Sequence, residues 1–359
     1  MDEFYGRRGF LPATDPLPRF PDGSPYAILD EIGRELPLRL EDPEFRAWGE
    51  GLSIPRWDQP LGATTLPELQ LYYLRLGFLA SGYINQVGFE RSHRLPANIA
   101  EPLIDACRTL ERPPILSYDG YALYNWYRQD PNGPIALGNI DTIQNFVSLY
   151  DEHWFVLVHV EIEAMAAGII NAVLQYDDGT LPIDDALVTI TEIVQDQGAV
   201  LRRIPEHMSP DLYFKTFRPY IRFFDKVLYE GKSPRCVSYR GETGAQSSVI
   251  PLLVAFFKIP HEPNALTRHV DDLRQYMPCP HRSLLERVES MPTIKEHADP
   301  VVFDSALEAI ADFRSIHYGW AKQYIHDRVD DPRGTGGTPY MSWLRQLIDE
   351  TLAFRAVSG

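Results

Sequence analysis

The stretch FRSIHYGWAKQYIHDRVDDPRGTGGT, from Phe313 to Thr338, indicates the class of fold and supplies the first candidate for a functional side chain. Its first half and the residues before it carry large side chains at steps of three and four, which places them on one face of a helix. That face consists of Leu307, Ile310, Phe313, His317, Trp320 and Tyr324. A histidine there is either a core residue held by one hydrogen bond or an axial ligand to a buried haem iron.

Two neighbours of His317 bear on that choice. Arg314 precedes it by almost one turn, where the guanidinium can pair with a haem propionate. The segment GTGGT, Gly334 to Thr338, has the composition of a flexible loop. Taken alone, these two features do not distinguish a cofactor site from ordinary structure, and both interpretations of His317 stay open.

Length, charge and cysteine usage limit the function classes. The chain has 359 residues, enough for a sizeable core and one or two domains. Its formal net charge is −16, with 34 basic and 50 acidic residues and no basic tract, which argues against nucleic acid and anionic membrane surfaces as partners. The three cysteines, Cys107, Cys236 and Cys279, lack metal-ligand or disulfide spacing, which suits a reducing cytoplasm.

The longest apolar run, Trp154 to Leu174, does not predict a membrane span. Polar residues that are costly in lipid interrupt it, namely His159, Glu161, Glu163 and Asn171. We therefore expect a buried helix there. The N-terminal segment lacks the apolar region of a signal peptide, so we expect a cytoplasmic protein with no membrane partner.

Periodicity along the rest of the chain predicts an all-α fold. The turn-forming segment DPNGP, Asp130 to Pro134, precedes an expected domain boundary. We expect a small, mostly helical N-terminal domain over residues 1–145, with an extended proline-rich arm and an aromatic pocket loop, and a large helical bundle over residues 146–359. Helices are expected over residues 26–36, 65–86, 97–110, 143–173, 183–203, 210–229, 247–257, 264–276, 280–290, 301–327 and 340–354, without a sheet.

Two further side chains are candidates for chemistry. His159 lies on a second apolar helix, and two histidines on buried helices fit the two sides of a haem, although spacing does not establish that they face each other. Arg218 lies in the aromatic run PDLYFKTFRPYIRFF, where it either covers aromatic rings or clamps a substrate carboxylate. For each residue the structural and the functional interpretation both stay open.

The segment YRGETGAQSSV, Tyr239 to Val249, places small and polar residues before an apolar helix. It either lets the backbone approach a cofactor edge or forms an ordinary loop with an N-cap serine. The sequence contains no Walker loop, GxSxG elbow, HExxH or CxxC motif, so hydrolase, phosphotransferase and zinc sites lack support.

These residues and several longer motifs resemble the indoleamine 2,3-dioxygenase family. The matching N-terminal motifs are LPANIAEPL (Leu95 to Leu103) and PPILSYDGYALYNW (Pro113 to Trp126). The C-terminal ones are GAQSSV, DLRQYMPCPHRSLLERVES (Asp272 to Ser290), RSIH and RGTGGT. The match covers most of the chain, and its C-terminal motifs are specific when they occur together.

The resemblance implies a haem b enzyme with dioxygen as co-substrate and an electron donor that keeps the iron ferrous. His317 matches the proximal iron ligand of the family and Arg314 the arginine at a haem propionate. Thr243 and Gly244 match small residues beside the haem edge.

The resemblance also implies a substrate site. Arg218 matches the arginine that binds the substrate carboxylate, and Thr335 matches the threonine of the loop that closes over the amino group. The aromatic lining of the pocket is matched by Tyr118, Phe155, Tyr213 and Phe214.

Two positions depart from the pattern of the animal enzymes. His159 stands where those enzymes carry a distal-pocket serine, and the segment DEHWFVLVH around it resembles the distal-histidine segment of tryptophan 2,3-dioxygenases. There it is expected to accept a hydrogen bond from the indole N–H or to act as a base. Tyr121 stands where a small cysteine is usual, which narrows the pocket beside the indole ring. Both departures predict a stricter preference for L-tryptophan.

The expected function is therefore cleavage of the indole 2,3-bond of L-tryptophan to N-formyl-L-kynurenine. One alternative is another haem-dependent oxidation or rearrangement of an indole amino acid in a biosynthetic pathway. A second is a non-catalytic haem or tryptophan binder, and a third is a purely structural helical protein, which would stay colourless when haem is available.

Overall fold

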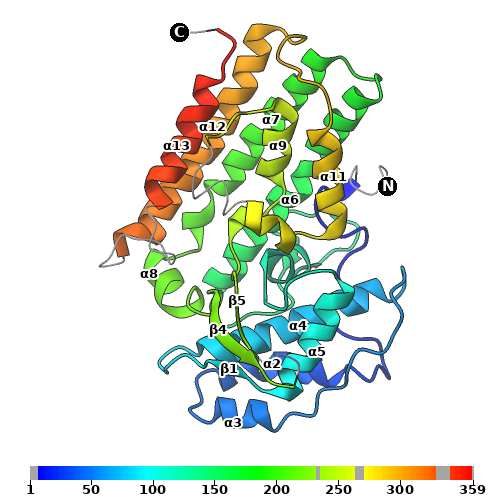
Figure 1. The fold of residues 1–359 in the computed structure, drawn as a ribbon, viewed down its shortest axis with the longest axis vertical. Helices are drawn as coiled ribbons and strands as arrows, with labels where there is room; N and C mark the ends of the chain where they lie inside the picture. Colours follow the sequence, from blue (N-terminus) through cyan, green and yellow to red (C-terminus); the bar gives the residue numbers. More distant parts are fainter. Residues whose placement is uncertain (1–6, 232–234, 263–270, 329–339, 358–359) are drawn as a thin grey trace.

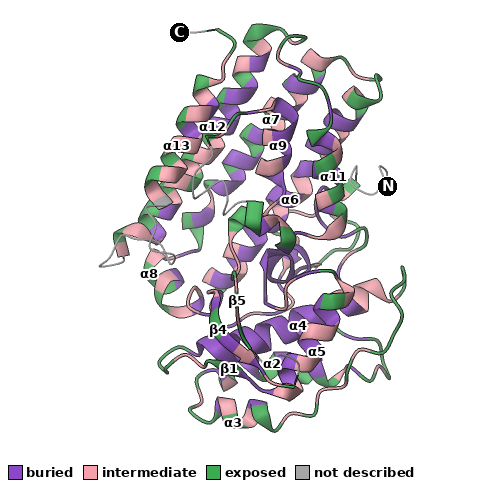
Figure 2. Ribbon diagram, viewed as in Figure 1, coloured by how far each residue is buried: buried purple, intermediate pink, exposed green. Residues whose placement is uncertain are grey.

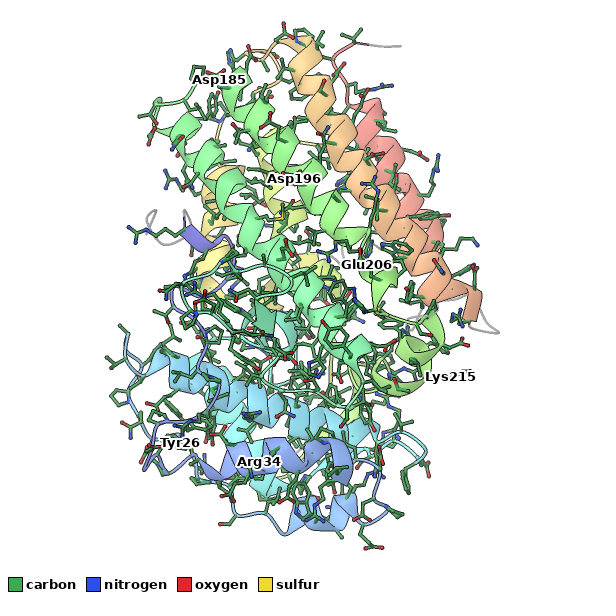
Figure 3. The ribbon with its side chains drawn as sticks, turned by 180° about the vertical axis from the view of Figure 1, so that it is seen from behind. Tyr26, Arg34, Asp185, Asp196, Glu206 and Lys215 are labelled. Atoms are coloured by element: carbon green, nitrogen blue, oxygen red, sulfur yellow. The ribbon has the colours of Figure 1, made fainter. Side chains whose placement is uncertain are left out.

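The computed structural model describes residues 7–231, 235–262, 271–328 and 340–357. One group of helices consists of α6 (Tyr150–Asp177), α7 (Ile183–Leu201), α9 (Val249–Phe257), α11 (Cys279–Glu289), α12 (Pro300–Tyr324) and α13 (Tyr340–Ala353). A second group consists of α2 (Ile28–Arg39), α3 (Phe45–Glu50), α4 (Leu66–Asn85) and α5 (Ala97–Thr109). The two groups occupy opposite ends of the long axis, with α12 packed between α7 and α13 (Figure 1). Seen from behind, Asp185 near the start of α7 and Arg34 on α2 mark those two ends (Figure 3).

The predicted all-α class is confirmed, but the prediction that the chain forms no sheet was wrong. Strand β4 (Phe224–Tyr229) pairs in parallel with β1 (Arg94–Leu95) and antiparallel with β5 (Cys236–Tyr239). A second small sheet pairs β2 (Tyr127–Arg128) with β3 (Ile140–Asp141). These strands have two to six residues, too few for a clear alternation of apolar and polar side chains.

The helix expected over residues 210–229 was also wrong. The chain forms α8 (Pro210–Leu212) and one wide π-helical turn (Tyr213–Phe217), then leaves the helix and enters β4. Pro219 supplies the physical reason, because it has no backbone N–H with which to continue the helix.

Helix α6 is the longest helix among the described residues, and it contributes side chains to apolar clusters at both ends of the molecule. It is long and apolar enough to cross a membrane, yet 61% of its most apolar window is buried inside the protein. The N-terminal arm packs against it, with the N–H of Phe10 donating to the carbonyl oxygen of Glu163 (3.2 Å). Gly9 makes this approach possible, because its φ is +60° and a Cβ there would lie 2.1 Å from the same oxygen.

Buried residues lie on the inward faces of both helix groups (Figure 2). One apolar cluster joins α2, α4 and α5 to the segment 115–126, and a second joins α6, α7, α9, α11 and α12. A third, around Val158, Phe217 and Tyr324, lies where α6, the π-helical turn and α12 meet. The first cluster also includes Val156 and Tyr220, beyond the expected domain boundary at residue 145, and that division stays a prediction.

Candidate active site

The face of α12 predicted from its periodicity points inward. Leu307 and Ile310 are 0% exposed and Tyr324 is 3% exposed. His317 lies between them, and it is nevertheless exposed. Burial among the surrounding protein still lowers the pKa of its imidazole. The imidazole of His317 is therefore accessible to a ligand although protein surrounds it.

His159, on α6, interacts electrostatically with His317. Burial lowers the pKa of His159 to about 4, a backbone hydrogen bond raises it, and the charge of His317 lowers it further, so the two imidazoles are close enough to interact. Nδ1 of His159 lies 2.7 Å from the carbonyl oxygen of Phe155. Because a carbonyl oxygen only accepts, Nδ1 carries the proton of the neutral ring and Nε2 remains as an acceptor.

Aromatic side chains predicted to line a pocket surround His159. The ring of Phe155 lies 4.6 Å from the imidazole and that of Tyr118 lies 6.1 Å from it, measured between centroids. Phe155 also contacts Tyr213 at 5.5 Å and Tyr121 at 6.2 Å. The structure thus brings together residues from α6, the segment 115–126 and the π-helical turn. They form one aromatic wall, which we define as Tyr118, Tyr121, Phe155 and Tyr213.

Arg218 follows the π-helical turn directly and is half-buried. Its guanidinium lies over the ring of Phe214, 5.3 Å from the centroid. Within the described ranges no carboxylate pairs with it. A guanidinium stacked on a ring keeps its hydrogen-bonding edge available for an incoming carboxylate. Thr335, predicted for the amino group of the same ligand, lies outside the described residues.

The segment after β5 borders open space. Oγ1 of Thr243 accepts the N–H of Ala245 (3.3 Å) and so caps the short helical turn Gly244–Gln246. Gly244 is exposed, and a Cβ added to it would meet no atom within 4 Å. Thr243 and Gly244 therefore present a small, uncrowded edge, and their place beside a flat cofactor stays a prediction.

Arg314 has partners that the sequence did not indicate. Its Nη1 donates to the carbonyl oxygen of Leu347 (2.7 Å) and to Thr351 on α13, and its Nη2 lies 3.3 Å from Nε2 of His261. His261 in turn pairs with Glu350 at 2.6 Å. Burial lowers the pKa of Arg314 to about 10. The expected contact with a propionate stays a prediction, and it requires at least one of these donors to change partner.

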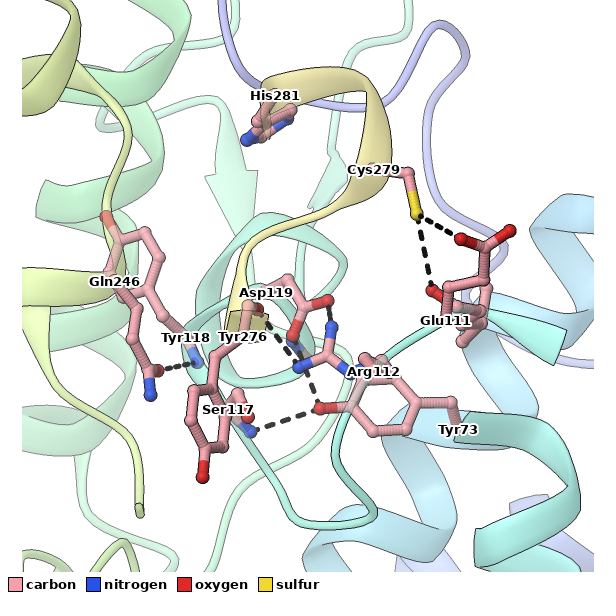
Figure 4. A network of polar contacts seen from close by, with 12 residues as sticks. Tyr73, Glu111, Arg112, Ser117, Tyr118, Asp119, Gln246, Tyr276, Cys279 and His281 are labelled. Carbon is pink, nitrogen blue, oxygen red and sulfur yellow. Dashed lines mark hydrogen bonds and ion pairs between the residues drawn. The ribbon is translucent and has the colours of Figure 1, made fainter. Parts of the chain in front are cut away.

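Polar residues that the sequence did not indicate hold the pocket loop, defined as residues 113–126. Arg112 and Asp119 form an ion pair whose side chains are 2% and 1% exposed. Nη2 of Arg112 also donates to the carbonyl oxygen of Tyr276 (3.3 Å), and Oε1 of Gln246 accepts the N–H of Tyr118 (2.9 Å; Figure 4). The sequence feature that could have indicated this ion pair is the single charged residue, Asp119, inside the aromatic run ILSYDGYALYNW.

Two buried carboxyl groups on α6 were also missed. Oε1 of Glu163 accepts hydrogen bonds from the hydroxyls of Tyr118 (2.8 Å) and Ser247 (2.6 Å). Oε1 of Glu152 accepts the hydroxyl of Tyr121 (3.1 Å). Both glutamates are 0% exposed, and burial raises the pKa of each to about 7. They fix the orientation of the two tyrosines in the aromatic wall.

A separate hollow of about 570 Å³ opens at the surface beside the end of α12. Its lining residues are Tyr150, Asp151, Pro205, Glu206, His207, Met208, Ser209, Pro210, Leu212, Gln323 and Tyr324. It contains none of the predicted site residues. We therefore take His317, which is accessible although protein surrounds it, and the aromatic wall as the candidate site.

The residues predicted for the cofactor site have the chemistry that a haem needs. An iron porphyrin needs one neutral imidazole on a rigid element, a flat space and an uncrowded rim. His317 on α12, with its lowered pKa, supplies the neutral imidazole. The open edge at Gly244 supplies the uncrowded rim. Among the described residues no group of three or more His, Cys, Asp or Glu side chains is arranged to hold a bare metal ion.

Comparison with known proteins agrees with this site. The family model described as indoleamine 2,3-dioxygenase matches residues 3–329. Indoleamine 2,3-dioxygenase 2 of Homo sapiens is 28% identical over 96% of this chain and 92% of its own length. The indoleamine 2,3-dioxygenase of Saccharomyces cerevisiae is 27% identical (96% and 91%), and a 6-hydroxytryptophan 2,3-dioxygenase of Fusarium equiseti is 27% identical (98% and 90%). The chain therefore belongs to the indoleamine 2,3-dioxygenase family and is a haem-dependent dioxygenase that acts on a small indole substrate.

Proposed function

We propose that the protein cleaves the indole 2,3-bond of L-tryptophan to N-formyl-L-kynurenine, with haem b as its cofactor. The observation that carries the proposal is the free Nε2 of the neutral His159, inside an aromatic wall and electrostatically close to His317. An indole N–H is a donor without an acceptor lone pair, so it matches a ring nitrogen that can only accept. The unpaired guanidinium of Arg218 matches the α-carboxylate.

Haem supplies the oxygen chemistry when it is bound, and an external electron donor keeps its iron ferrous. His317 would hold the iron, Thr243 and Gly244 would border the cofactor edge, and Arg314 would bind a propionate. Thr335 would contact the substrate amino group.

The chain's own residues orient the substrate and exclude water. Arg218 would fix the carboxylate through a charge-assisted hydrogen bond, which contributes about 1.5–3 kcal/mol. Tyr118, Phe155 and Tyr213 would cover the faces of the indole, and Tyr121 would limit the space beside it. His159 would hold the indole N–H, and it would take the proton if the N–H ionises during the reaction.

The product made from L-tryptophan tests the proposal. Reduced, haem-loaded protein is given L-tryptophan and ¹⁸O₂, and the products are analysed by mass spectrometry. We expect N-formylkynurenine with two labelled oxygen atoms. A product with one labelled atom would show that the reaction is a monooxygenation and not the proposed cleavage. The absence of turnover on L-tryptophan would contradict the proposed substrate.

Replacing Arg218 by leucine is expected to lower kcat/KM for L-tryptophan by about 10- to 100-fold, because the carboxylate loses a charge-assisted partner. Tryptamine lacks the carboxylate, so its turnover should change little. Parallel steady-state measurements with both compounds check the assignment. An equal loss for both would mean that Arg218 supports the pocket rather than the carboxylate.

Replacing His159 by serine is expected to weaken the discrimination against 1-methyl-tryptophan. The methyl group removes the N–H donor and collides with an imidazole acceptor, whereas a smaller serine leaves space for it. The quantity to measure is the ratio of kcat/KM for L-tryptophan to that for 1-methyl-tryptophan. If this ratio is the same in both proteins, the indole N–H does not bind His159.

A second candidate is the same cleavage of a ring-substituted tryptophan. One relative is named a 6-hydroxytryptophan 2,3-dioxygenase. A substrate panel of L-tryptophan and its 5- and 6-hydroxy derivatives separates the two, since kcat/KM ranks them directly.

A further inference from the structure

The loop that carries Glu242 is fixed beside Arg218. The N–H of Glu242 donates to the carbonyl oxygen of Ile221 (3.0 Å), which follows Arg218 by three residues. The preceding Gly241 is buried against the same segment, where a Cβ would lie 2.3 Å from the Ile221 oxygen. Only glycine fits this close approach, so Glu242 is held against the element that carries the proposed carboxylate clamp.

The same loop is tied to the aromatic wall on its other side. Nε2 of Gln246 donates to the carbonyl oxygen of Gly241 (3.0 Å), while its Oε1 accepts the N–H of Tyr118 (2.9 Å; Figure 4). Burial is the main cause that raises the pKa of Tyr118 and of Tyr121, and the charge of Glu242 is a further cause for both. The Glu242 carboxyl therefore lies near both tyrosines.

Glu242 differs from the other two carboxyl groups near this wall. Glu152 and Glu163 are 0% exposed and accept tyrosine hydroxyls, so a ligand cannot reach them. Glu242 is half-buried and therefore reachable. Within the part of the chain that the structure describes, its carboxyl makes no hydrogen bond or ion pair. Burial alone raises its pKa to about 8, without an opposing effect from a cation.

We propose that Glu242 binds the α-ammonium group of the substrate while Arg218 binds its α-carboxylate, so that the site selects zwitterionic indole amino acids. The inference rests on the proposed function, because it requires an indole amino acid in this cavity. Amines would lose the contact with Arg218, and deaminated acids would lose the contact with Glu242.

The arrangement suits a zwitterion because the two side chains do not neutralise each other. Arg218 and Glu242 lie on adjoining segments, and among the described residues they form no ion pair with each other. The guanidinium keeps its hydrogen-bonding edge for a ligand, and the carboxyl of Glu242 keeps both of its oxygens for one. An ammonium group arriving at Glu242 supplies the missing cation and favours the ionised carboxylate.

Ligand binding to the haem-loaded protein tests the inference. Dissociation constants are measured from the Soret shift for L-tryptophan, for indole-3-propionate, which lacks the ammonium, and for tryptamine, which lacks the carboxylate. In Glu242→Gln we expect affinity for L-tryptophan and tryptamine to fall about 10- to 100-fold, with indole-3-propionate unchanged. Arg218→Leu should give the crossed pattern, a loss for L-tryptophan and indole-3-propionate only.

Two further variants guard against a folding defect. Glu242→Asp keeps the charge and should recover part of the affinity for L-tryptophan, and Glu90→Gln makes the same change as the test variant at an exposed position and should alter nothing. Equal losses for all three ligands, or reduced haem content with unchanged discrimination, would overturn the inference. Wild-type protein that turns over L-tryptophan while Glu242→Gln binds it normally would refute the role of Glu242 alone. Wild-type protein without affinity for L-tryptophan would refute the proposed function and the inference together.

Discussion

Replacing His317 by alanine is expected to abolish stable haem binding and, with it, all dioxygenase activity. His317 lies on the inward face of α12 and is accessible although protein surrounds it. Burial lowers the pKa of its imidazole, which favours the neutral form that an iron ligand requires. The variant protein should be purified colourless from cells supplied with haem. Its haem content and Soret band are the measurements.

Two controls make this result specific. His297 is exposed, so His297→Ala should keep a full haem content. His317→Gly leaves a space of the shape of the lost ring, and added imidazole should restore a Soret band there. A His317→Ala protein with normal haem content and an unchanged Soret band would show that another side chain holds the iron.

The part of the site that follows helical periodicity could be predicted from the sequence. His317 and His159 lie on long helices, where three- and four-residue steps determine which side chains point inward. Three members of the aromatic wall, Tyr118, Phe155 and Tyr213, were expected from the family resemblance, and Tyr121 was expected as a departure from it. The structure brings the four together. Elements that depend on distant pairing were missed, as β4 shows, because its partners β1 and β5 lie in other parts of the chain.

The residues that fix the site could not be predicted for the same reason. Gln246 joins Tyr118 to Gly241 across more than a hundred positions of sequence, and no local pattern encodes such a contact. Arg314 was expected to pair with a propionate, but its guanidinium donates to the carbonyl oxygen of Leu347 on α13. Spacing identifies the face on which a side chain lies, and only the packed structure identifies its partner.

The ion pair between Arg112 and Asp119 leads to a prediction about stability. Asp119→Asn is expected to lower the free energy of unfolding by about 3–5 kcal/mol, the usual cost of breaking a buried pair from one side. The change preserves the shape of the side chain but leaves the guanidinium, which cannot lose its proton, without a counter-ion. Both side chains are at most 2% exposed, so water cannot replace the lost partner. Urea unfolding of the haem-loaded protein, followed by tryptophan fluorescence, measures the loss.

An exposed pair supplies the matched control and separates charge from burial. Asp349 pairs with Arg345 one helical turn away, with side chains 56% and 64% exposed, so Asp349→Asn should cost about 0–1 kcal/mol. Equal effects of the two substitutions would mean that the buried pair is not important for stability. Because Asp119 lies between Tyr118 and Tyr121 on the pocket loop, its loss should also raise KM for L-tryptophan at temperatures where the variant is still folded. An unchanged KM in a destabilised variant would show that Glu152, Glu163 and Gln246 hold the two tyrosines without help from the ion pair.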